Sequence, residues 1–406
     1  MSRIQYTNAN PQGLKILHNA IINTLNQLLD TAARKAGIKI DDILELTVVG
    51  NTTMHHIFLN LSPHQLGTAP YIPTQFRSMD IKARELGLKI NKSGNIHILP
   101  IIAAFIGSDT AGVLLAEEPH MQNESWLIID IGTNAELVLG NKTKLICASA
   151  PTGPALEGAH IQYGMRAAAG AIEHIRIDDK TLETQFKIIG EKMWNRGKAK
   201  GICGSAMIDA VAELFRVGIL DASGKFRFTE STTRLRKGDN GLEYILVNEE
   251  DTSIGMAIPL TQKDVRQIQL AKGALFVAAR TLLNQIGLRT PDKILLAGAF
   301  GSYIDKTNAM LIGMIPDCPL ENVYAVGNSA GDGARIALLN IEKREEVEEV
   351  AARLTSYELP TDPDFQNQFI QAMNIPHKIE QFPHIAHLIP RPKADTSTLN
   401  IIGEND

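Results

Sequence analysis

The chain has 406 residues, of which 44% are hydrophobic and 21% charged, so it can bury a large core and is too long for one ordinary domain. Its 40 Lys and Arg residues against 45 Asp and Glu residues give a net charge of −5, which makes nucleic acid an unfavourable partner. Three dispersed cysteines (Cys147, Cys203 and Cys318) exclude a disulfide scaffold and an iron–sulfur cluster held by this chain alone. With no signal-peptide pattern and no apolar run of membrane-spanning length, the sequence predicts a soluble cytoplasmic protein.

The first half of the chain predicts helices that alternate with short strands. Apolar residues recur with a helical period over 13–36, and Gly37 ends that helix. Further elements are predicted as strands at 46–49 and 96–99 and helices at 54–61 and 107–115. Ser108 or Asp109 is the expected N-cap of the last helix.

The second half predicts a three-stranded meander followed by helices and strands in alternation. The meander strands are expected at 126–130, 136–139 and 144–148. The later elements are expected as helices at 203–216 and 264–287, strands at 293–297 and 324–326, and a glycine-rich segment at 327–333 that runs into a helix ending at 340. The tail from about residue 356 is rich in Pro and His and is expected to wrap the surface.

The two halves share an order of elements that indicates an internal repeat. In each half a helix leads to a strand, a glycine-containing turn, a second strand and another small-residue turn. The second half begins with the meander, whereas residues 1–122 contain no counterpart. We therefore predict an α/β fold with a truncated first lobe at 1–122, a second lobe at 123–355 and a tail at 356–406.

The clearest candidate site is the segment 130–134, Asp-Ile-Gly-Thr-Asn, at the end of a buried strand. A carboxylate such as Asp130 can hold Mg²⁺ directly or through water. Gly132 lets the backbone approach a phosphate, and Thr133 adds a hydroxyl donor. Because a strand follows, the segment does not fit a P-loop or a dinucleotide fingerprint. An ordinary hairpin turn is the alternative.

Two further loops could line a nucleotide cleft. The turn at 298–302 would let a ligand lie against bare backbone beside Phe300, or its glycines would only permit close packing. The loop at 150–158 carries Gly153 and Glu157, and it would line the same cleft or form a structural turn.

Small residues at 201–206 precede an amphipathic helix. They leave the first amides of the helix free for an anion or a ligand oxygen, while the alternative is that Ser205 serves as the N-cap. Cys203 is interpreted as a packed thiol, because no base lies near it in the sequence. The adjacent pair His55 and His56 would point to different sides of a helix and does not predict a shared metal.

Together these motifs resemble known families. Segments 130–133 and 296–301 look like the phosphate and adenosine motifs of the actin, sugar-kinase and heat-shock-chaperone (ASKHA) superfamily, which implies duplicated ribonuclease-H-like lobes. More specific stretches resemble the ATP-dependent reductive activators of corrinoid proteins over nearly the whole chain; they are 49–56, 130–136, 164–168 and 201–205.

The resemblance implies roles for the candidate residues. Asp130 would be the catalytic residue and would hold Mg²⁺ through water, and Ser205 would contact the partner or its corrinoid. The expected ATP-binding residues are Gly132, Thr133, Asn134, Gly153, Glu157, Gly298, Ala299, Phe300 and Gly301.

Activators of this type return inactive Co(II) corrinoid to Co(I), an uphill reduction that is coupled to ATP. The implied partner is a corrinoid iron–sulfur protein or a corrinoid methyltransferase protein, and a homodimer is also considered. The family carries a [2Fe–2S] ferredoxin domain and a first phosphate meander that this sequence lacks, so electrons would come from elsewhere. Two alternatives stay open: a small-molecule kinase of the same superfamily, and a non-catalytic docking module with a degenerate ATPase.

Overall fold

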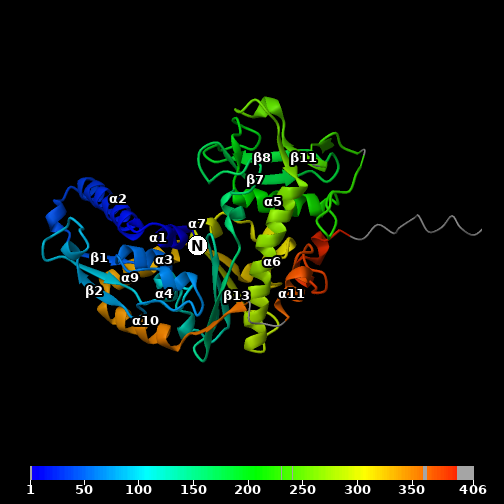
Figure 1. The fold of residues 1–406 in the computed structure, drawn as a ribbon. Helices are drawn as coiled ribbons and strands as arrows, with labels where there is room; N and C mark the ends of the chain where they lie inside the picture. The colour runs from blue at the N-terminus through cyan, green and yellow to red at the C-terminus, as the bar shows by residue number, and fades with distance from the viewer. Residues whose placement is uncertain (1, 230, 240, 360–363, 391–406) are drawn as a thin grey trace, which may run out of the picture.

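A six-stranded sheet lies in the middle of the molecule, as seen in a computed structural model that describes residues 2–229, 231–239, 241–359 and 364–390 (Figure 1). The strands in the described residues are β1 Glu45–Val48, β2 Met79–Lys82, β3 Asn95–Ile98, β4 Trp126–Ile131, β5 Ala135–Gly140, β6 Leu145–Ala150, β7 Ala171–Ile177, β8 Thr184–Ile188, β9 Gly201–Ile202, β10 Leu235–Gly238, β11 Gly241–Val247, β12 Ile258–Thr261, β13 Lys293–Ala297, β14 Val323–Gly327 and β15 Thr355–Tyr357. The helices are α1 Ser2–Ala9, α2 Gly13–Ala36, α3 Thr52–Phe58, α4 Ser108–Glu117, α5 Gly204–Arg216, α6 Gln262–Gln285, α7 Gly298–Gly301, α8 Lys306–Leu311, α9 Ser329–Leu339, α10 Ile341–Arg353 and α11 Phe365–Ala372.

The central sheet has the strand order β14-β13-β4-β5-β6-β15. Strands β4, β5 and β6 form the predicted antiparallel meander, and β13 pairs in parallel with β4. Successive side chains alternate between its faces, so Leu127 and Ile129 join the large core that contains α5 and α6, while Ile128 packs with residues of α4. Asp130 follows the same alternation onto the α4 side.

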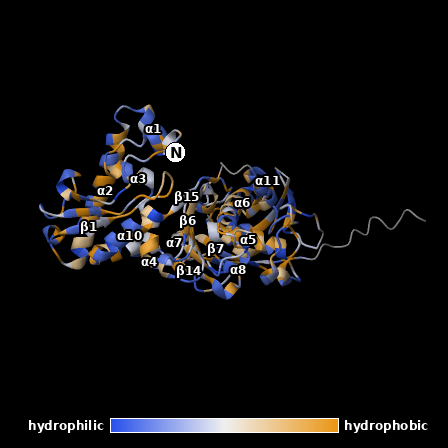
Figure 2. Ribbon diagram, turned by 90° about the horizontal axis from the view of Figure 1, so that it is seen from below, coloured by the Kyte–Doolittle hydropathy of each residue, from blue (hydrophilic) through white to orange (hydrophobic). Residues whose placement is uncertain are grey.

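A second sheet, β1-β3-β2, is covered by helices from distant parts of the sequence (Figure 1). Its hydrophobic core holds Ile22 of α2 and Phe58 of α3 against Ile96 and Ile98 of β3. Helices α9 and α10 lie near the same sheet, and the Arg344 guanidinium forms an ion pair with Glu45 at 2.9 Å. Figure 2 shows hydrophobic and hydrophilic residues alternating around α2, as expected of a helix with one buried face.

The two sheets differ in whether the strand after the long helix is an inner strand or an edge strand. In the central sheet β13 has neighbours on both sides, β14 and β4, whereas β1 pairs only with β3 within the described residues. The meander therefore has no counterpart in the described part of the first sheet. The lobe boundaries near residues 122 and 355 stay a prediction.

Most predicted elements form close to the expected bounds, and the helix at 13–36 and the strand at 293–297 match residue for residue. The predicted cap of α4 is wrong, because Gly107 occupies the N-cap and the Ser108 hydroxyl instead bonds to the backbone of Gly50. The tail does more than wrap the surface, since Phe382 and Ile385 are buried in the large core. None of the helices in the described residues is long and apolar enough to cross a membrane.

Helices α4 and α9 cross where neither has a side chain. A Cβ atom on Gly112 would lie 2.6 Å from the Ala330 carbonyl oxygen, and one on Gly333 would lie 1.8 Å from the Gly112 oxygen. Both distances are far shorter than a van der Waals contact. The atoms in the way belong to the backbone, so they cannot rotate away as a side chain could. The crossing therefore depends on glycine at both positions.

We predict that Gly333→Ala lowers the free energy of unfolding by about 1–3 kcal/mol, the usual cost of forcing a methyl group into a packed interior. Gly273→Ala in α6 is the matched control, because the nearest atom to its new Cβ is 3.5 Å away. The control should be neutral or stabilising, since alanine is the better helix former. Urea unfolding of both variants measures this, and equal stabilities would contradict the account of the crossing.

Candidate functional site

The candidate site begins where β4 and β13 end side by side. Asp130 and Ala297 are paired in the parallel register, so the turn that follows β13 starts next to the Asp130 carboxyl group. Gly298 has φ +87°, and a Cβ there would lie 2.7 Å from Asp130 Oδ1. Only glycine combines this backbone conformation with such a close approach. The predicted residues Asp130 and Gly298 are thus brought into contact.

Three carboxyl groups gather on this face of the central sheet. Asp130 and Glu136 are register partners on neighbouring strands, and Asp109 comes from the first turn of α4. Burial, and then the charge of Asp109, raises the pKa of Asp130 to about 6. Burial, followed by the charges of Asp109 and Asp130, raises the pKa of Glu136 well above its usual value. The three groups therefore repel one another in a poorly solvated place.

Asp130 has no hydrogen-bond or ion-pair partner within the described part of the chain, whereas Glu136 Oε1 accepts a hydrogen bond from the Ser149 hydroxyl at 3.4 Å. No set of three or more His, Cys, Asp or Glu side chains in the same residues is arranged to hold a metal ion by itself. A cation at Asp130 would therefore need most of its ligands from water and from a bound phosphate. The sequence analysis did not place Asp109 or Glu136 in the site, and it treated Asp109 only as a helix cap. Glu136 could have been found, because it lies six residues after Asp130 and therefore opposite it in a short hairpin.

Hydrogen bonds fix the turn after Asp130 on one side, while its other side is exposed to solvent. The Gly132 N–H donates to the Asn134 carbonyl oxygen at 2.9 Å, and the Thr152 hydroxyl donates to the Thr133 carbonyl oxygen at 3.2 Å. The Thr133 hydroxyl donates to Glu157 Oε1, which joins two predicted residues. Gly132, Thr133 and Asn134 are all exposed, so their polar groups can reach a ligand.

The loop at 153–158 and the turn at 298–301 both pack against Gly204, the first residue of α5. A Cβ on Gly204 would lie 1.9 Å from the Leu156 carbonyl oxygen and 2.6 Å from Phe300 Cε2. The segment 298–301 forms the short helix α7 instead of a plain turn, and Gly301 is buried. The Ala299 side chain lies outside the described part. The structure thus brings together Glu157, Phe300 and the start of α5, which come from three separate segments.

Ser205 is buried, with 2% of its surface exposed. Its hydroxyl donates to the Glu173 carbonyl oxygen at 2.8 Å, and the N-cap of α5 is Cys203. The alternative that Ser205 caps the helix is therefore wrong, because its side chain turns sideways to β7. Cys203, like Cys147 and Cys318, is a buried free thiol.

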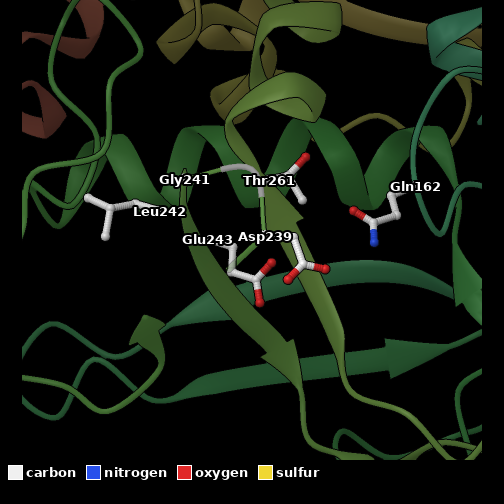
Figure 3. A pocket seen from close by; sticks show the side chains of 6 residues that line it. All are labelled: Gln162, Asp239, Gly241, Leu242, Glu243 and Thr261. Carbon is white, nitrogen blue, oxygen red and sulfur yellow. The ribbon is translucent and has the colours of Figure 1, made fainter. Parts of the chain in front are cut away.

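Two cavities lie away from these residues. The smaller, of about 40 Å³, is lined by side chains that include Gln162, Asp239 and Thr261 and is only large enough for water (Figure 3). The larger, of about 680 Å³, lies between the end of α5 and the segment 375–390. Neither is lined by a residue that the sequence predicted for the site.

Comparison with known proteins gives consistent matches over both halves of the chain. The family model described as the C-terminal domain of RACo, the ASKHA domain, matches residues 124–386, and the model of the RACo middle region matches residues 1–122. The corrinoid activation enzyme RamQ of Eubacterium limosum is 35% identical over 379 residues, which cover 91% of this chain and 62% of that protein.

Two further proteins are similar. A reductase of the Co(II) methylated amine-specific corrinoid protein from Methanosarcina barkeri is 28% identical over 386 residues, covering 88% of this chain and 67% of that protein. The solved structure of a reductive activator for corrinoid, iron-sulfur protein matches with a TM-score of 0.83 and 36% identity, covering 93% of this chain and 59% of that one. The chain spans about 60% of the length of the proteins it matches.

The raised pKa of Asp130 predicts an unusual dependence of stability on pH. The folded state binds the Asp130 proton more tightly than the unfolded chain does, so stability is lost as pH rises from about 4 through about 6. Asp130→Asn removes this loss and should stabilise the protein at pH 7.5 by at most about 3 kcal/mol, with little gain below pH 4.

Thermal unfolding between pH 4 and 8 measures this difference. Asp178→Ala is the opposing control, because hydrogen bonds from the backbone of Thr181 and Lys180 lower the pKa of Asp178, so its removal should destabilise at neutral pH. A constant difference between wild type and Asp130→Asn across the pH range would contradict the buried charge.

Proposed function

The chain belongs to the RACo family, with an ASKHA domain at 124–386, and from this we propose that it is the ATP-binding, ATP-hydrolysing part of a reductive activator of corrinoid proteins. One observation carries the proposal: the Asp130 carboxyl group is partly buried, with no positively charged partner among the described residues, at the point where the turns after β4 and β13 meet. Such a group favours a cation–phosphate complex, which would supply the missing positive charge.

The residues around Asp130 fit a magnesium–nucleotide complex. Asp130 would hold Mg²⁺ through water, and Gly132 would leave room for a phosphate beside its backbone. The Thr133 hydroxyl would exchange its hydrogen bond to Glu157 for one to a phosphate oxygen. When bound, Mg²⁺ would neutralise phosphate charge and would lower the repulsion among Asp109, Asp130 and Glu136. Asn134 would add an amide donor at the edge of the turn.

The adenosine would lie on the other side of Asp130. Gly298 and Ala299 would present backbone to it, with Phe300 beside the ring, while the buried Gly301 would let α7 pack closely against Leu296 of β13. Gly153 and Glu157 would line the opposite side of the nucleotide, on the loop that already contacts Thr133 through the hydrogen bond to Glu157. Closure of these segments on the nucleotide would link its binding to a change of conformation.

The reaction that the nucleotide would drive is reduction of inactive Co(II) corrinoid to Co(I) in a partner protein. The partner would be a corrinoid iron–sulfur protein or a corrinoid methyltransferase protein, and we expect the encounter to take place in the cytoplasm. The three cysteines are buried and dispersed, so the electron would come from a [2Fe–2S] ferredoxin domain outside these 406 residues. A homodimer would be compatible with this arrangement.

A docking module with a degenerate ATPase is the second candidate. The unpaired edge of β1 within the described residues favours it, because a phosphate loop on that side would complete the clamp on ATP. Nucleotide-dependent phosphate release separates the two functions, since a docking module would bind the partner without turnover. A small-molecule kinase would transfer the phosphoryl group to its own substrate and release ADP without free phosphate.

We predict that Asp130→Ala abolishes Mg²⁺-dependent ATP hydrolysis, in this chain and at the equivalent position of a full-length relative. The loss of one contact to the metal–phosphate complex should cost about 2–4 kcal/mol, or roughly 30- to 1,000-fold in turnover. Steady-state phosphate release measures it. Asp30→Ala, at an exposed ion pair on α2, is the control and should keep full turnover; unchanged turnover in Asp130→Ala would reduce the motif to a hairpin.

We also predict that Ser205→Ala weakens binding of the corrinoid protein by at least about fivefold, or 1 kcal/mol, and leaves nucleotide affinity unchanged. Ser205 is buried, so its contact with a partner requires a rearrangement around the start of α5. Loss of its hydrogen bond to Glu173 alone would lower stability by about 1 kcal/mol. A partner-binding titration together with thermal unfolding distinguishes the two, and a stability loss with normal partner binding would refute the contact.

A further inference from the structure

Helix α5 runs along one edge of β7 and supplies the partners that a neighbouring strand would otherwise supply (Figure 1). Strand β9 pairs only with Ala171 and Ile172, and the Cys203 N–H donates to the Ile172 carbonyl oxygen at 3.0 Å. Beyond Ile172 this edge of β7 has no strand beside it within the described residues. The polar groups of the β7 backbone from Glu173 onward therefore need other partners.

Side chains of α5 meet that need in a regular series, which we call the α5 ladder: Ser205, Asp209 and Glu213. The Ser205 hydroxyl donates to the Glu173 carbonyl oxygen at 2.8 Å. The Ile175 N–H donates to Asp209 Oδ2 at 3.3 Å, and the Ile177 N–H donates to Glu213 Oε2 at 2.8 Å.

The ladder forms because the rise of the helix and that of the strand match at this spacing. Four residues of helix rise about 6 Å and two residues of strand rise about 6.6 Å, so every fourth residue of α5 stays level with every second residue of β7. The Arg216 guanidinium closes the series by donating to the Ile177 carbonyl oxygen at 2.7 Å. Helix and strand are thereby fixed in register and must move together.

Asp209 is the most connected member of the ladder. Besides the Ile175 amide, its carboxylate accepts from His174 Nδ1 at 3.0 Å and from the Asn308 amide of α8 at 2.8 Å. Burial raises the pKa of Asp209, while the hydrogen bonds from His174 and Asn308 lower it. The hydrogen bond to Asp209 raises the pKa of His174, and the charges of Glu173 and Lys187 act on it in opposite directions. Asp305, at the start of α8, is the remaining charge that acts on Asp209.

The first residue of α5 lies against the candidate nucleotide site. Gly204 leaves no free space between Leu156 and Phe300, since a Cβ would overlap both. A displacement of Phe300 or of the loop at 153–158 on nucleotide binding must therefore displace the start of α5, because close-packed contacts transmit such shifts.

We propose that Asp209 is a positioning residue of the ATP-dependent reaction, which through the α5 ladder couples the nucleotide turn at 298–301 to the β7–β8 hairpin. The proposal rests on the proposed ATP-binding function. The β7–β8 hairpin is then the segment whose conformation changes when the nucleotide binds. His174, whose side chain is 30% exposed, links the buried Asp209 to the protein surface.

Hydrogen exchange on the protein with and without a non-hydrolysable Mg–ATP analogue tests the coupling at the amides of Ile175 and Ile177. In the unaltered protein the analogue should change their exchange rates at least about fivefold. In Asp209→Asn the analogue should bind with an affinity within about twofold of the original, and the change at these amides should fall below about twofold.

Asp264→Asn is the matched control, because Asp264 is a buried carboxylate that accepts from the Thr261 and Gln162 amides and lies outside the ladder. It should keep the full response at β7. Glu213→Gln is a second ladder variant in case Asp209→Asn fails to fold, and it should weaken the response at Ile177 first. A titration of the His174 ring by NMR adds a local readout, since Asp209→Asn should lower its pKa.

The outcomes separate the two proposals. Analogue binding with an undiminished β7 response in Asp209→Asn would overturn the coupling and leave the ATP-binding function intact. Absence of analogue binding to the unaltered protein would overturn both. Binding without any response at Ile175 and Ile177 in the unaltered protein would overturn the coupling alone.

Discussion

Three partly buried carboxyl groups that lie close together on one face of the central sheet are the feature on which the rest of this structure depends. Asp130 and Glu136 come from adjacent strands, and Asp109 comes from α4, which packs on the same face of the sheet. Burial raises the pKa values of all three groups, and the charges of neighbouring carboxylates raise those of Asp130 and Glu136 further. A fold that keeps this arrangement gives up stability at neutral pH, and a bound metal–nucleotide complex would recover it.

The glycines around this cluster allow neighbouring backbone segments to approach one another more closely than any side chain would permit. Gly298 allows the turn after β13 to close over Asp130, and Gly204 allows α5 to begin against Phe300 and Leu156. At the α4–α9 crossing, Gly112 and Gly333 bring two helices from opposite ends of the chain into backbone contact. The site therefore rests on rigid, close-packed supports, so that a small change at the nucleotide turn has few ways to relax locally.

The sequence predicted most of the strands and helices of the central sheet, because buried apolar runs such as 293–297 and strong helical periods such as 13–36 carry a clear local signal. Strand β2 was not predicted, since Met79–Lys82 alternates charged and apolar residues over only four positions and pairs at a sheet edge. At the candidate site, the contacts of Asp130 with Gly298 and of Thr133 with Glu157 follow from motifs that could be recognised. The sideways hydrogen bond of Ser205 could not be predicted, because it depends on an edge of β7 that only the tertiary fold creates.

The position of a bound metal–nucleotide complex decides whether Asp130 belongs to the nucleotide site. Crystals grown with Mn²⁺ and a non-hydrolysable ATP analogue would show the metal by its anomalous scattering. We predict a metal peak beside the Asp130 carboxyl group, at a distance that leaves room for one water, roughly 4 Å, with the adenine next to Phe300. A nucleotide bound elsewhere, for example in the 680 Å³ cavity beside the segment 375–390, with no metal at Asp130, would contradict it.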